Sequence, residues 1–460
     1  MNRSTNRGGR STFKRVLLVL AIMVPLGACD TEALLEVDEP SFATPATLRN
    51  EAGLPTLYAG AIGDFQVGYS GAGLADSYLA NVSLFSDELK SSDTFTTRNA
   101  TDYRESFPVV QGNTSDLAYE QLQYARRSAA EIAAVVEEIM GTSDPRYVTL
   151  KSLEGFAIIA LAEAFCGAVP LGMAEQGAPA ELGTPLTTQQ LFAEAVARFD
   201  AALAADPNSN LAKVGKGRAL LNNGDYAGAA AAVAGVPLDF VYFVEHSSNS
   251  SRQYNPIFAL QDNRRYSMSD VEGQNGMDYV SANDPRTPWY MHAQLGFDNT
   301  TPVVRSARYR DYGADVVLAD GIQAQLIRAE AALRAGDASW LTLLNELRAQ
   351  VGPLMTARYG DLSAYPQSAN PLPPLTDPGT DAARVDLLFR ERAFWLYLSG
   401  TRLGDMRRLI RQYGRASETV FPTGPWHKGG VYGTDVNLPI PFDEQQNKNY
   451  DPDLCDTKQA

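Results

Sequence analysis

Histidine and cysteine are scarce in this sequence, with three residues of each type among 460. His246, His292 and His427 are far apart, and no two histidines or cysteines have the spacing of metal ligands. Three cysteines also cannot form a disulfide framework. The sequence contains neither a phosphate-binding P-loop nor a His-Glu-x-x-His pattern. We therefore predict no metal site, no cofactor and no catalytic residue.

Basic residues are also fewer than acidic ones. The chain has 39 Lys and Arg against 54 Asp and Glu, which gives a formal net charge of -15. Binding of nucleic acid requires a basic surface, so this class of function is excluded. The hydrophobic content of 45% and the charged content of 20% are those of a globular protein. Beyond Leu26 no run approaches the roughly 18 apolar residues of a membrane-spanning helix.

The N-terminal segment, Met1 to Asp30, has the pattern of an export signal. Five basic residues precede an apolar run from Val16 to Leu26, which then ends in Gly27-Ala28-Cys29. This junction resembles the lipobox of bacterial lipoproteins, in which residues 1–28 are removed and Cys29 is acylated, with palmitate among the usual chains. Without those five basic residues, the rest of the chain would carry a net charge near -20. An ordinary signal peptide is the alternative, and Asp30 leaves the choice between inner and outer membrane open.

Cys166 and Cys455 are the two cysteines of the body of the chain. Export to an oxidising compartment permits a disulfide between them. The sequence gives no distance, so a disulfide and two free thiols are equally compatible with it.

Helical periodicity dominates the body of the chain. Apolar residues recur at spacings of three to five over 116–140, and a second, almost wholly apolar helix is predicted over 151–165. Thr187 to Gln190 fits a capping box for the next helix. Further helices are predicted over 211–221, 227–234, 321–334 and 339–351. The polar stretch from Gly60 to Thr101 shows no such periodicity.

Two short segments resemble the turn of tetratricopeptide repeats. Leu221-Asn-Asn-Gly-Asp-Tyr226 joins one pair of predicted helices, and Leu333-Arg-Ala-Gly-Asp337 joins another. Glycine permits the sharp turn between two antiparallel helices. The two copies are too far apart in the chain to be neighbours in a tandem array. We predict helix pairs over about 115–235 and 319–412, separated by an insertion.

The insertion, at about 236–318, is rich in aromatic residues and poor in helical pattern. It contains Tyr242, Phe243, Tyr254, Phe258, Tyr266, Tyr279, Trp289, Tyr290, Phe297, Tyr309 and Tyr312. A proline-rich loop over 352–381 and a glycine- and proline-rich loop over 420–433 follow. Long loops in a compact protein are commonly functional, and aromatic residues argue against disorder.

The first part of the C-terminal block 382–460, at 387–410, reads LLFRERAFWLYLSGTRLGDMRRLI. We expect Arg407, Arg408 and Arg411 to face outward from its second helix. This segment resembles the SusD/RagB family of outer-membrane nutrient-binding lipoproteins. The arginine and aspartate residues here are expected to pin helices together. Pro-Ile-Pro at 439–441 matches the family's terminal stretch, and Leu57 to Ala61 resembles its first helix. The segment Leu403-Gly404-Asp405 departs from the family, since many members have an aromatic residue before the aspartate.

The resemblance implies a fold and a function. It implies a mostly α single domain over 29–460, with tetratricopeptide-like helix pairs as a scaffold and long irregular, aromatic-rich loops inserted into it. It also implies a surface lipoprotein of the outer membrane that captures a glycan or another nutrient. The ligand then passes to a partner SusC-like TonB-dependent transporter, on which the lipoprotein forms a lid.

Aromatic residues are the best candidates for contact with a sugar, because sugar rings have apolar faces and polar rims. The adjacent Trp289 and Tyr290, preceded by Arg286, rank first. The remaining candidates are Trp426, Tyr69 and Tyr78. The competing interpretation is that Trp289 and Tyr290 fill the core below the insertion.

Two other classes of protein remain open. An exported glycoside hydrolase needs two facing carboxylates, whereas neighbours such as Asp87 and Glu88 point in different directions in most conformations. Gly68-Tyr-Ser-Gly-Ala72 only partly matches the nucleophile elbow of hydrolases. A periplasmic helical-repeat scaffold that binds proteins would be favoured by repeats in tandem, which this chain lacks.

Overall fold

The computed structural model describes residues 45–105, 114–172 and 182–460. Within these ranges Ala46–Ala460 form one compact unit. The expected signal segment, 1–28, and the expected lipidation site, Cys29, lie outside the described residues. In the part of the chain that is described, no helix has both the length and the hydropathy that crossing a membrane requires.

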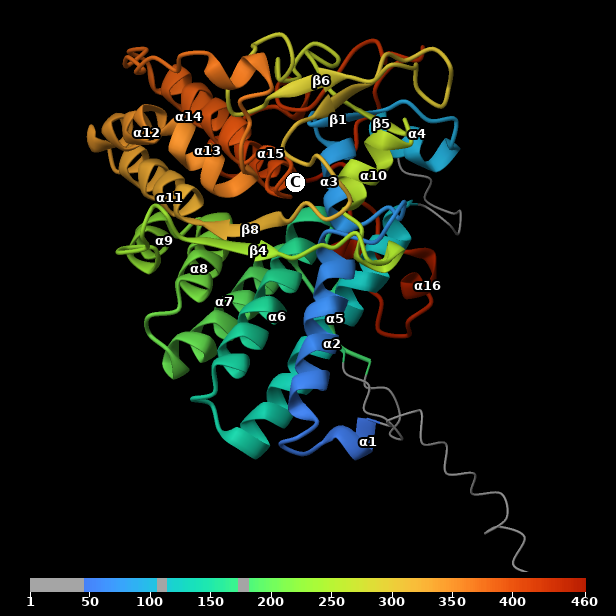
Figure 1. The fold of residues 1–460 in the computed structure, drawn as a ribbon, viewed down its shortest axis with the longest axis vertical. Coiled ribbons are helices and arrows are strands. Elements are labelled where there is room, and N and C mark those ends of the chain that lie inside the picture. Colours follow the sequence, from blue (N-terminus) through green and yellow to red (C-terminus); the bar gives the residue numbers. More distant parts are fainter. Residues whose placement is uncertain (1–44, 106–113, 173–181) are drawn as a thin grey trace, which may run out of the picture. The chain divides into compact units, whose positions relative to one another are not determined.

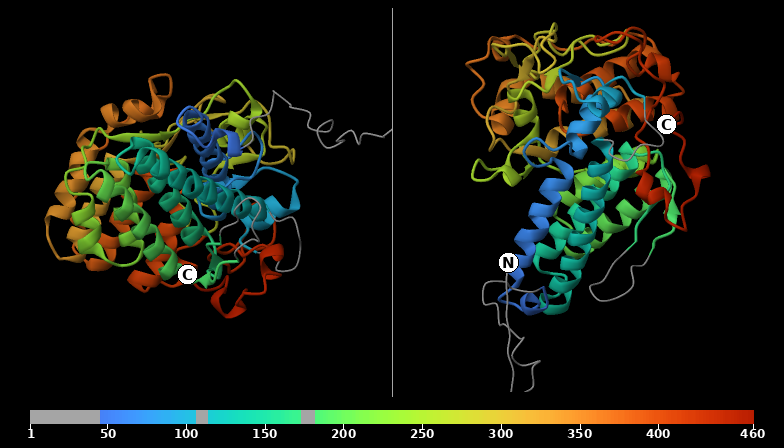
Figure 2. Two further views of the ribbon diagram at one scale, coloured as in Figure 1. Left: turned by 90° about the horizontal axis from the view of Figure 1, so that it is seen from below. Right: turned by 90° about the vertical axis from the view of Figure 1, so that its right-hand side faces the viewer.

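A succession of packed helices forms the scaffold of this unit. Each helix packs against the next: α2 on α5, α5 on α6, α6 on α7, α7 on α8, α8 on α9, α9 on α11 and α11 on α12 (Figures 1 and 2). The contact between α9 and α11 joins the two predicted groups of helix pairs across the insertion. The helices are α2 (Leu54–Tyr69), α5 (Thr114–Met140), α6 (Pro145–Ala164), α7 (Thr188–Ala205), α8 (Asn210–Asn222), α9 (Tyr226–Ala232), α11 (Gly321–Arg334) and α12 (Ser339–Ala349).

The signals read from the sequence account for these helices. Thr187 and Gln190 form the predicted capping box at the start of α7. The apolar helix α6 is buried on all sides over most of its length, as its composition predicted. Gly224 and Gly336 have φ values of +86° and +72°, which only glycine adopts without strain, so both tetratricopeptide-like turns are confirmed.

The close packing of these helices depends on glycine at one crossing. A Cβ atom on Gly155 of α6 would lie 2.7 Å from the ring of Phe199, and one on Gly215 of α8 would lie 2.2 Å from it. The ring of Phe199, on α7, therefore fills the space that these two glycines leave. A side chain at either position would force the three helices apart.

The polar stretch Gly60 to Thr101 was predicted without helices, and this was wrong. It contains the end of α2, all of α3 (Tyr78–Phe85) and most of α4 (Thr96–Asp102), and every residue of α3 is buried. Its polar residues are used inside the protein: Ser77 accepts from the backbone N–H of Ala80, and the Asn81 amide donates to the carbonyl of Asp76. When polar side chains are buried with partners, the sequence lacks the hydrophobic periodicity from which a helix is predicted.

The proline-rich loop predicted over 352–381 is also partly a helix. α13 (Val351–Tyr359) includes Gly352 and Pro353 in its first turn. Proline is tolerated there, because the first N–H groups of a helix have no acceptor within the helix. Only the rest of this segment, with the short helix η2 (Pro366–Ala369), is irregular.

Short strands and turns make up the insertion, as its lack of helical pattern predicted. All strand pairs of the described residues are antiparallel and two-stranded, and two of them bring together segments far apart in the chain. The insertion also contains α10 (Pro256–Asp262) and η1 (Ser251–Gln253). Its strands pair as β4 (Val241–Val244) with β8 (Val316–Asp320), β6 (Trp289–Met291) with β7 (Val304–Ser306), and β5 (Tyr266–Met268) with β1 (Leu89–Ser91) from outside the insertion. A further pair, β2 (Val169–Pro170) with β3 (Pro185–Leu186), precedes the insertion.

The C-terminal block packs through buried ion pairs. Asp405 accepts from Arg392 at 2.7 and 2.8 Å and from Arg408 at 2.7 Å, and Arg402 forms two bonds to Asp87, 315 residues away. The expected pinning role of these residues is thereby confirmed. The two helices that carry these residues are α14 (Asp381–Trp395) and α15 (Arg402–Tyr413).

The remaining helical elements are short: α1 (Pro45–Leu48), η3 (Ser417–Thr419), α16 (Phe442–Gln445) and η4 (Pro452–Leu454).

The orientation predicted for two arginines of α15 was wrong. Arg407 is 1% exposed and Arg408 is fully buried, although both were expected to face outward. Arg408 lies inside because it pairs with Glu330 of α11 and with Asp405. A charge pattern along one helix does not show that a neighbouring helix provides a carboxylate.

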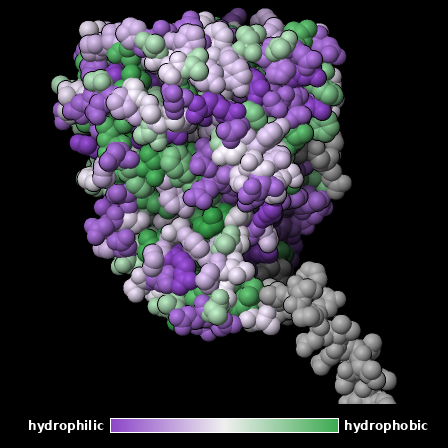
Figure 3. Space-filling model, in the orientation of Figure 1, coloured by the Kyte–Doolittle hydropathy of each residue, from purple (hydrophilic) through white to green (hydrophobic). Residues whose placement is uncertain are grey.

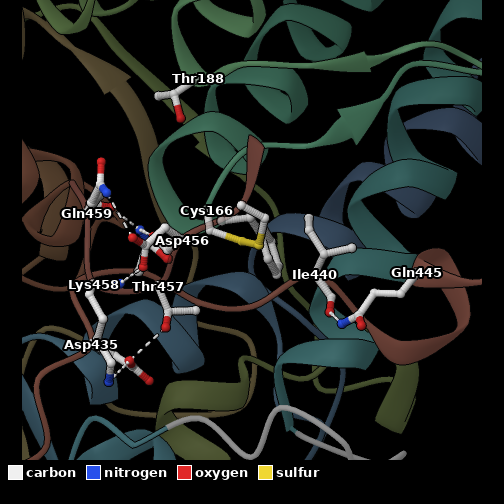
Figure 4. Close-up of a disulfide and its surroundings, with 12 residues drawn as sticks. Cys166, Thr188, Asp435, Ile440, Gln445, Asp456, Thr457, Lys458 and Gln459 are labelled. Carbon is white, nitrogen blue, oxygen red and sulfur yellow. Dashed lines mark hydrogen bonds and ion pairs between the residues drawn. A yellow bond between two sulfur atoms is a disulfide. The ribbon is translucent and has the colours of Figure 1, made fainter. Parts of the chain in front are cut away.

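Cys166 and Cys455 form a disulfide between the end of α6 and the C-terminal segment (Figure 4). Their Cα atoms are 4.7 Å apart, and 289 positions separate them in the sequence. Beyond the disulfide, Lys458 pairs with Asp435, and the Asn437 amide donates to the carbonyl of Gln459. The end of the chain is thus fixed to the body of the protein.

Candidate functional site: a strip of tyrosines

Four half-buried tyrosines and one ion pair form a continuous row, which we call the tyrosine strip. The ring centres of Tyr254 and Tyr312 are 4.3 Å apart, and the Tyr312 hydroxyl donates to Asp262 at 3.1 Å. Asp262 pairs with Arg305 at 2.9 Å. The strip consists of Tyr254, Asp262, Arg305, Tyr312, Tyr290 and Tyr365.

The second half of the strip is built on a strand pair. Tyr290 of β6 lies directly opposite Arg305 of β7, whose guanidinium carbon is 5.1 Å from the centre of the Tyr290 ring. On its other side Tyr290 contacts Tyr365, with ring centres 5.6 Å apart and planes inclined by 35°. The backbone register of β6 and β7 therefore fixes the two central side chains of the strip.

Trp289, the neighbour of Tyr290, points elsewhere. Successive side chains of a strand alternate between its two faces. The Trp289 indole N–H donates to the carbonyl of Val280 at 3.1 Å, and its side chain, like that of Tyr290, contacts the hydrophobic core. Trp289 therefore supports the hairpin from beneath, while Tyr290 belongs to the strip.

The strip rests on an apolar base and presents polar groups. Phe258, 8% exposed, contacts both the Tyr312 ring and the Arg305 guanidinium from beneath. Burial raises the pKa of Tyr290 and the pKa of Tyr312, so both hydroxyls stay protonated near neutral pH. The Asp262 side chain is 37% exposed, whereas two Arg305 donors, Nε and Nη2, are buried and have no acceptor among the described residues.

Trp426 lies in a second cluster, near β1 and α4. Its indole N–H donates to Asp102 at 2.9 Å, and its ring meets Tyr103 edge-on at 5.2 Å. Burial raises the pKa of Asp102 to about 8, while burial lowers the pKa of His427. Trp426 is held by these contacts and is half-buried.

The structure places the other three expected ligand residues in the interior. Tyr69 and Tyr78 are each 1% exposed, and their hydroxyls donate to the carbonyls of Ser399 and Gly400. Arg286 is equally buried and pairs with Asp284 and Glu391. These residues hold the C-terminal block against the rest of the protein, so we leave them out of the proposed site.

A separate cleft lies between β4 and the helices α2 and α6. Its volume is about 460 Å³, and it is lined by Tyr58, Ile62, Phe65, Leu153 and residues 241–245. Hydrophobic side chains gather on the face of the unit that carries β4 (Figure 3). The cleft is distinct from the strip, because the two share no residue.

The residues considered for hydrolysis have structural partners. Asp87 pairs with Arg402, and Glu88 accepts from the backbone N–H of Leu398 at 2.7 Å. Ser70 lies at the end of α2 rather than at a strand-to-helix turn, and it is fully buried. In the described residues, no group of three or more potential ligands has the arrangement of a metal site.

Comparison with known proteins gives two results for the fold. Residues 186–241, which cover α7 to α9, match the family model of the tetratricopeptide repeat. Surface glycan-binding protein A from Bacteroides uniformis superposes with a TM-score of 0.62, and the match covers 89% of this chain and 100% of that one. The chain has the SusD fold. The expected resemblance and the mostly α fold class are therefore confirmed.

Other proteins with the SusD fold match over similar lengths. A SusD superfamily protein from Bacteroides vulgatus gives a TM-score of 0.61, with coverage of 89% of this chain and 98% of that one. A laminarin-binding SusD-like protein gives 0.53, with 87% and 98% covered. Sequence identities are 12% for the glycan-binding protein, 12% for the Bacteroides vulgatus protein and 14% for the laminarin-binding protein. No curated protein matches the sequence.

Only part of the strip was predicted from the sequence. Tyr290 was among the expected ligand residues, and Tyr254 and Tyr312 were only members of the aromatic-rich insertion. Arg305, Asp262 and Tyr365 were missed. If two short antiparallel strands had been recognised at 289–291 and 304–306, their pairing would have placed Arg305 opposite Tyr290.

Proposed function

We propose that this protein is a surface lipoprotein that binds a glycan through the tyrosine strip. The observation that carries the proposal is the row of half-buried tyrosine rings with an Arg305–Asp262 pair at its centre, in which the Asp262 side chain is 37% exposed. Aromatic faces stack on the apolar faces of sugar rings, while a guanidinium and a carboxylate bind their hydroxyls. The laminarin-binding SusD-like protein and the surface glycan-binding protein A, which share this fold, support this ligand class.

In this proposal the protein binds its ligand and does not transform it. Residues 1–28 are a signal peptide, and lipid on Cys29 anchors the protein in the outer membrane. The ligand passes from the strip to a SusC-like TonB-dependent transporter. The support for these parts is the sequence from Met1 to Asp30 and the resemblance of the C-terminal block.

Trp426 is proposed as a second contact on the ligand. It lies near β1, which pairs with β5; β5 in turn contacts β7 of the strip. A glycan of several units would be needed to reach both places. Trp289 has a supporting role, because it lies on the opposite face of β6 from Tyr290.

A glycan array with the purified protein, followed by calorimetry on the best binder, tests the ligand class. Tyr290→Ala and Tyr312→Ala are each expected to weaken binding about tenfold, which corresponds to about 1.4 kcal/mol. Tyr124→Ala on α5 is the matched control, since Tyr124 is exposed and far from the strip in sequence. Unchanged affinity in both strip variants, with intact folding, would reject the strip as the site.

The anchor and the partner need separate tests. Cys29→Ser should move the protein from the membrane fraction to the soluble fraction, and mass spectrometry should find acyl chains only on the wild-type N-terminal peptide. A tagged wild-type protein extracted in mild detergent should retain a TonB-dependent transporter. Recovery of the tagged protein without any transporter would contradict the proposed partner. Glycan binding is tested separately, by calorimetry.

A further inference from the structure

The buried arginines around α15 differ in how their charge is compensated. Arg402 pairs with Asp87, Arg408 with Glu330 and Asp405, and Arg392 with Asp405. Arg218, on the neighbouring α8, pairs with Glu163. Each of these guanidinium groups thus faces at least one carboxylate. Within the described residues, Arg407 and Arg411, four positions apart on α15, form no such pair.

Arg407 is enclosed and bonds only to neutral groups. Its Nη1 donates to the carbonyls of Ala162, Glu163 and Phe165 at the end of α6, at 2.8 to 3.1 Å. Its Nη2 reaches the hydroxyl of Thr188 in the first turn of α7 at 3.5 Å (Thr188 is labelled in Figure 4). Its Nε is buried and has no acceptor in the described part of the chain.

Arg411 lies one helical turn further on, so its side chain shares a face of α15 with that of Arg407. The residue is half-buried. Its Nη1 is fully buried, and among residues 45–105, 114–172 and 182–460 it has no hydrogen-bond partner. Burial, together with the nearby positive charge of Arg408, lowers the pKa of Arg411 to about 10.

Glu163 of α6 is the acid whose charge acts on both groups, and it is already engaged. Its carboxylate binds the Arg218 guanidinium in two bonds, the Asn222 amide at 2.8 Å and the Tyr78 hydroxyl at 3.2 Å. A buried charge without a counter-charge is costly, and two like charges side by side raise that cost.

We propose that Arg407 and Arg411 bind one small inorganic anion, with chloride as the abundant example. The anion supplies an acceptor for Arg407 Nε and for Arg411 Nη1, two buried donors that lack one among the described residues. Its charge compensates the like charges on this face of α15. The site must be small because Arg407 is only 1% exposed, and the half-buried Arg411 forms its entrance.

Two measurements on the purified protein test the site. Crystals grown in sodium bromide should show an anomalous difference peak within hydrogen-bonding distance of both guanidinium groups. In solution, replacing sodium gluconate with sodium chloride at constant ionic strength should raise Tm by about 2–4 °C at roughly 100 mM. The absence of a bromide peak at these groups would overturn the proposal.

Variants distinguish a specific site from a general salt effect. Arg411→Met should abolish both the peak and the chloride-dependent rise in Tm, whereas Arg411→Lys should keep a smaller rise. Arg328→Met is the matched control, because Arg328 is an exposed arginine on α11, and its full chloride response should remain. If Arg411→Met responds to chloride as the wild type does, the ion is adventitious and the proposal fails.

Discussion

Tyr290 and Arg305 lie directly opposite each other on β6 and β7, and the guanidinium carbon of Arg305 is 5.1 Å from the centre of the Tyr290 ring. This contact joins two aromatic pairs, Tyr290 with Tyr365 and Tyr254 with Tyr312, through the carboxylate of Asp262. The strip therefore depends on the strand register rather than on loop conformation alone.

Arg305→Lys is expected to weaken glycan binding about threefold to tenfold. A lysine ammonium keeps the charge but has neither the planar face that stacks on Tyr290 nor the fork of donors. Calorimetry with the glycan identified on the array measures this change, and Arg328→Lys serves as the control. Full affinity in Arg305→Lys, with an unchanged Tm, would show that the guanidinium does not contact the ligand.

Asp405→Asn is expected to lower the free energy of unfolding by about 3–5 kcal/mol at pH 7. The substitution leaves Arg392 and Arg408 with less buried negative charge. Urea unfolding measures the loss, and Asp381→Asn, at a 97% exposed side chain, is the control. A loss as small as that of the control would contradict a structural role for this ion network.

The same variant should change the response to acid. Although burial opposes ionisation of Asp405, Arg392 and Arg408 lower its pKa to about 2. Because this pKa is lower in the folded state, the carboxylate stabilises the fold above its unfolded pKa near 4, and this contribution is lost as the pH falls towards 2. Asp405→Asn should therefore show a shallower loss of stability between pH 4 and pH 2.

Asp102→Asn should alter the pH dependence of stability at higher pH than Asp405→Asn does. Burial raises the pKa of Asp102 to about 8, so between about pH 4 and pH 8 the folded state holds a proton that the unfolded state releases. Stability must then fall as the pH rises through this window. The variant keeps an acceptor for the Trp426 indole N–H and should lose less stability between pH 5 and pH 8.

Thermal unfolding at pH 5 and pH 8 measures this difference. Glu138→Gln on α5 is the control, since Glu138 is exposed, and its pH profile should match that of the wild type. An Asp102→Asn profile that is parallel to the wild-type profile would show that Asp102 does not take up a proton on folding.

Removal of the disulfide should destabilise the protein. Cys166 and Cys455 close a loop of 289 residues, for which the chain-entropy model gives an upper value of about 6 kcal/mol; removal of a native disulfide typically costs about 2–5 kcal/mol. Denaturant unfolding of the Cys166→Ala/Cys455→Ala variant measures it. Hydrogen exchange should also speed up in the segment after Cys455, and unchanged protection there would show that Lys458 and Gln459 hold the segment without the disulfide.

The sequence predicted the scaffold well because its signals are local. The capping box at Thr187 and the glycine turns at Gly224 and Gly336 act within one or two helices, and the predicted bounds of α11 agree with the structure. The helix α13 was missed because Pro353 was interpreted as a loop residue, although it lies in a first turn.

Long-range partners explain the remaining differences. Arg408 was expected outside because its carboxylate partner, Glu330, lies 78 residues away in the sequence. Tyr69 and Tyr78 were expected at a ligand because no local pattern links them to their partners, Ser399 and Gly400, in the C-terminal block. The strip likewise gathers residues from 254 to 365, and no local pattern in the sequence connects them.

A crystal structure of the protein with the oligosaccharide selected on the glycan array most directly tests the role of the strip. We predict sugar rings against the faces of Tyr290 and Tyr312, with hydroxyls on Asp262 and Arg305. An oligosaccharide bound only in the cleft between α2 and β4, with no sugar on the strip, would contradict this prediction.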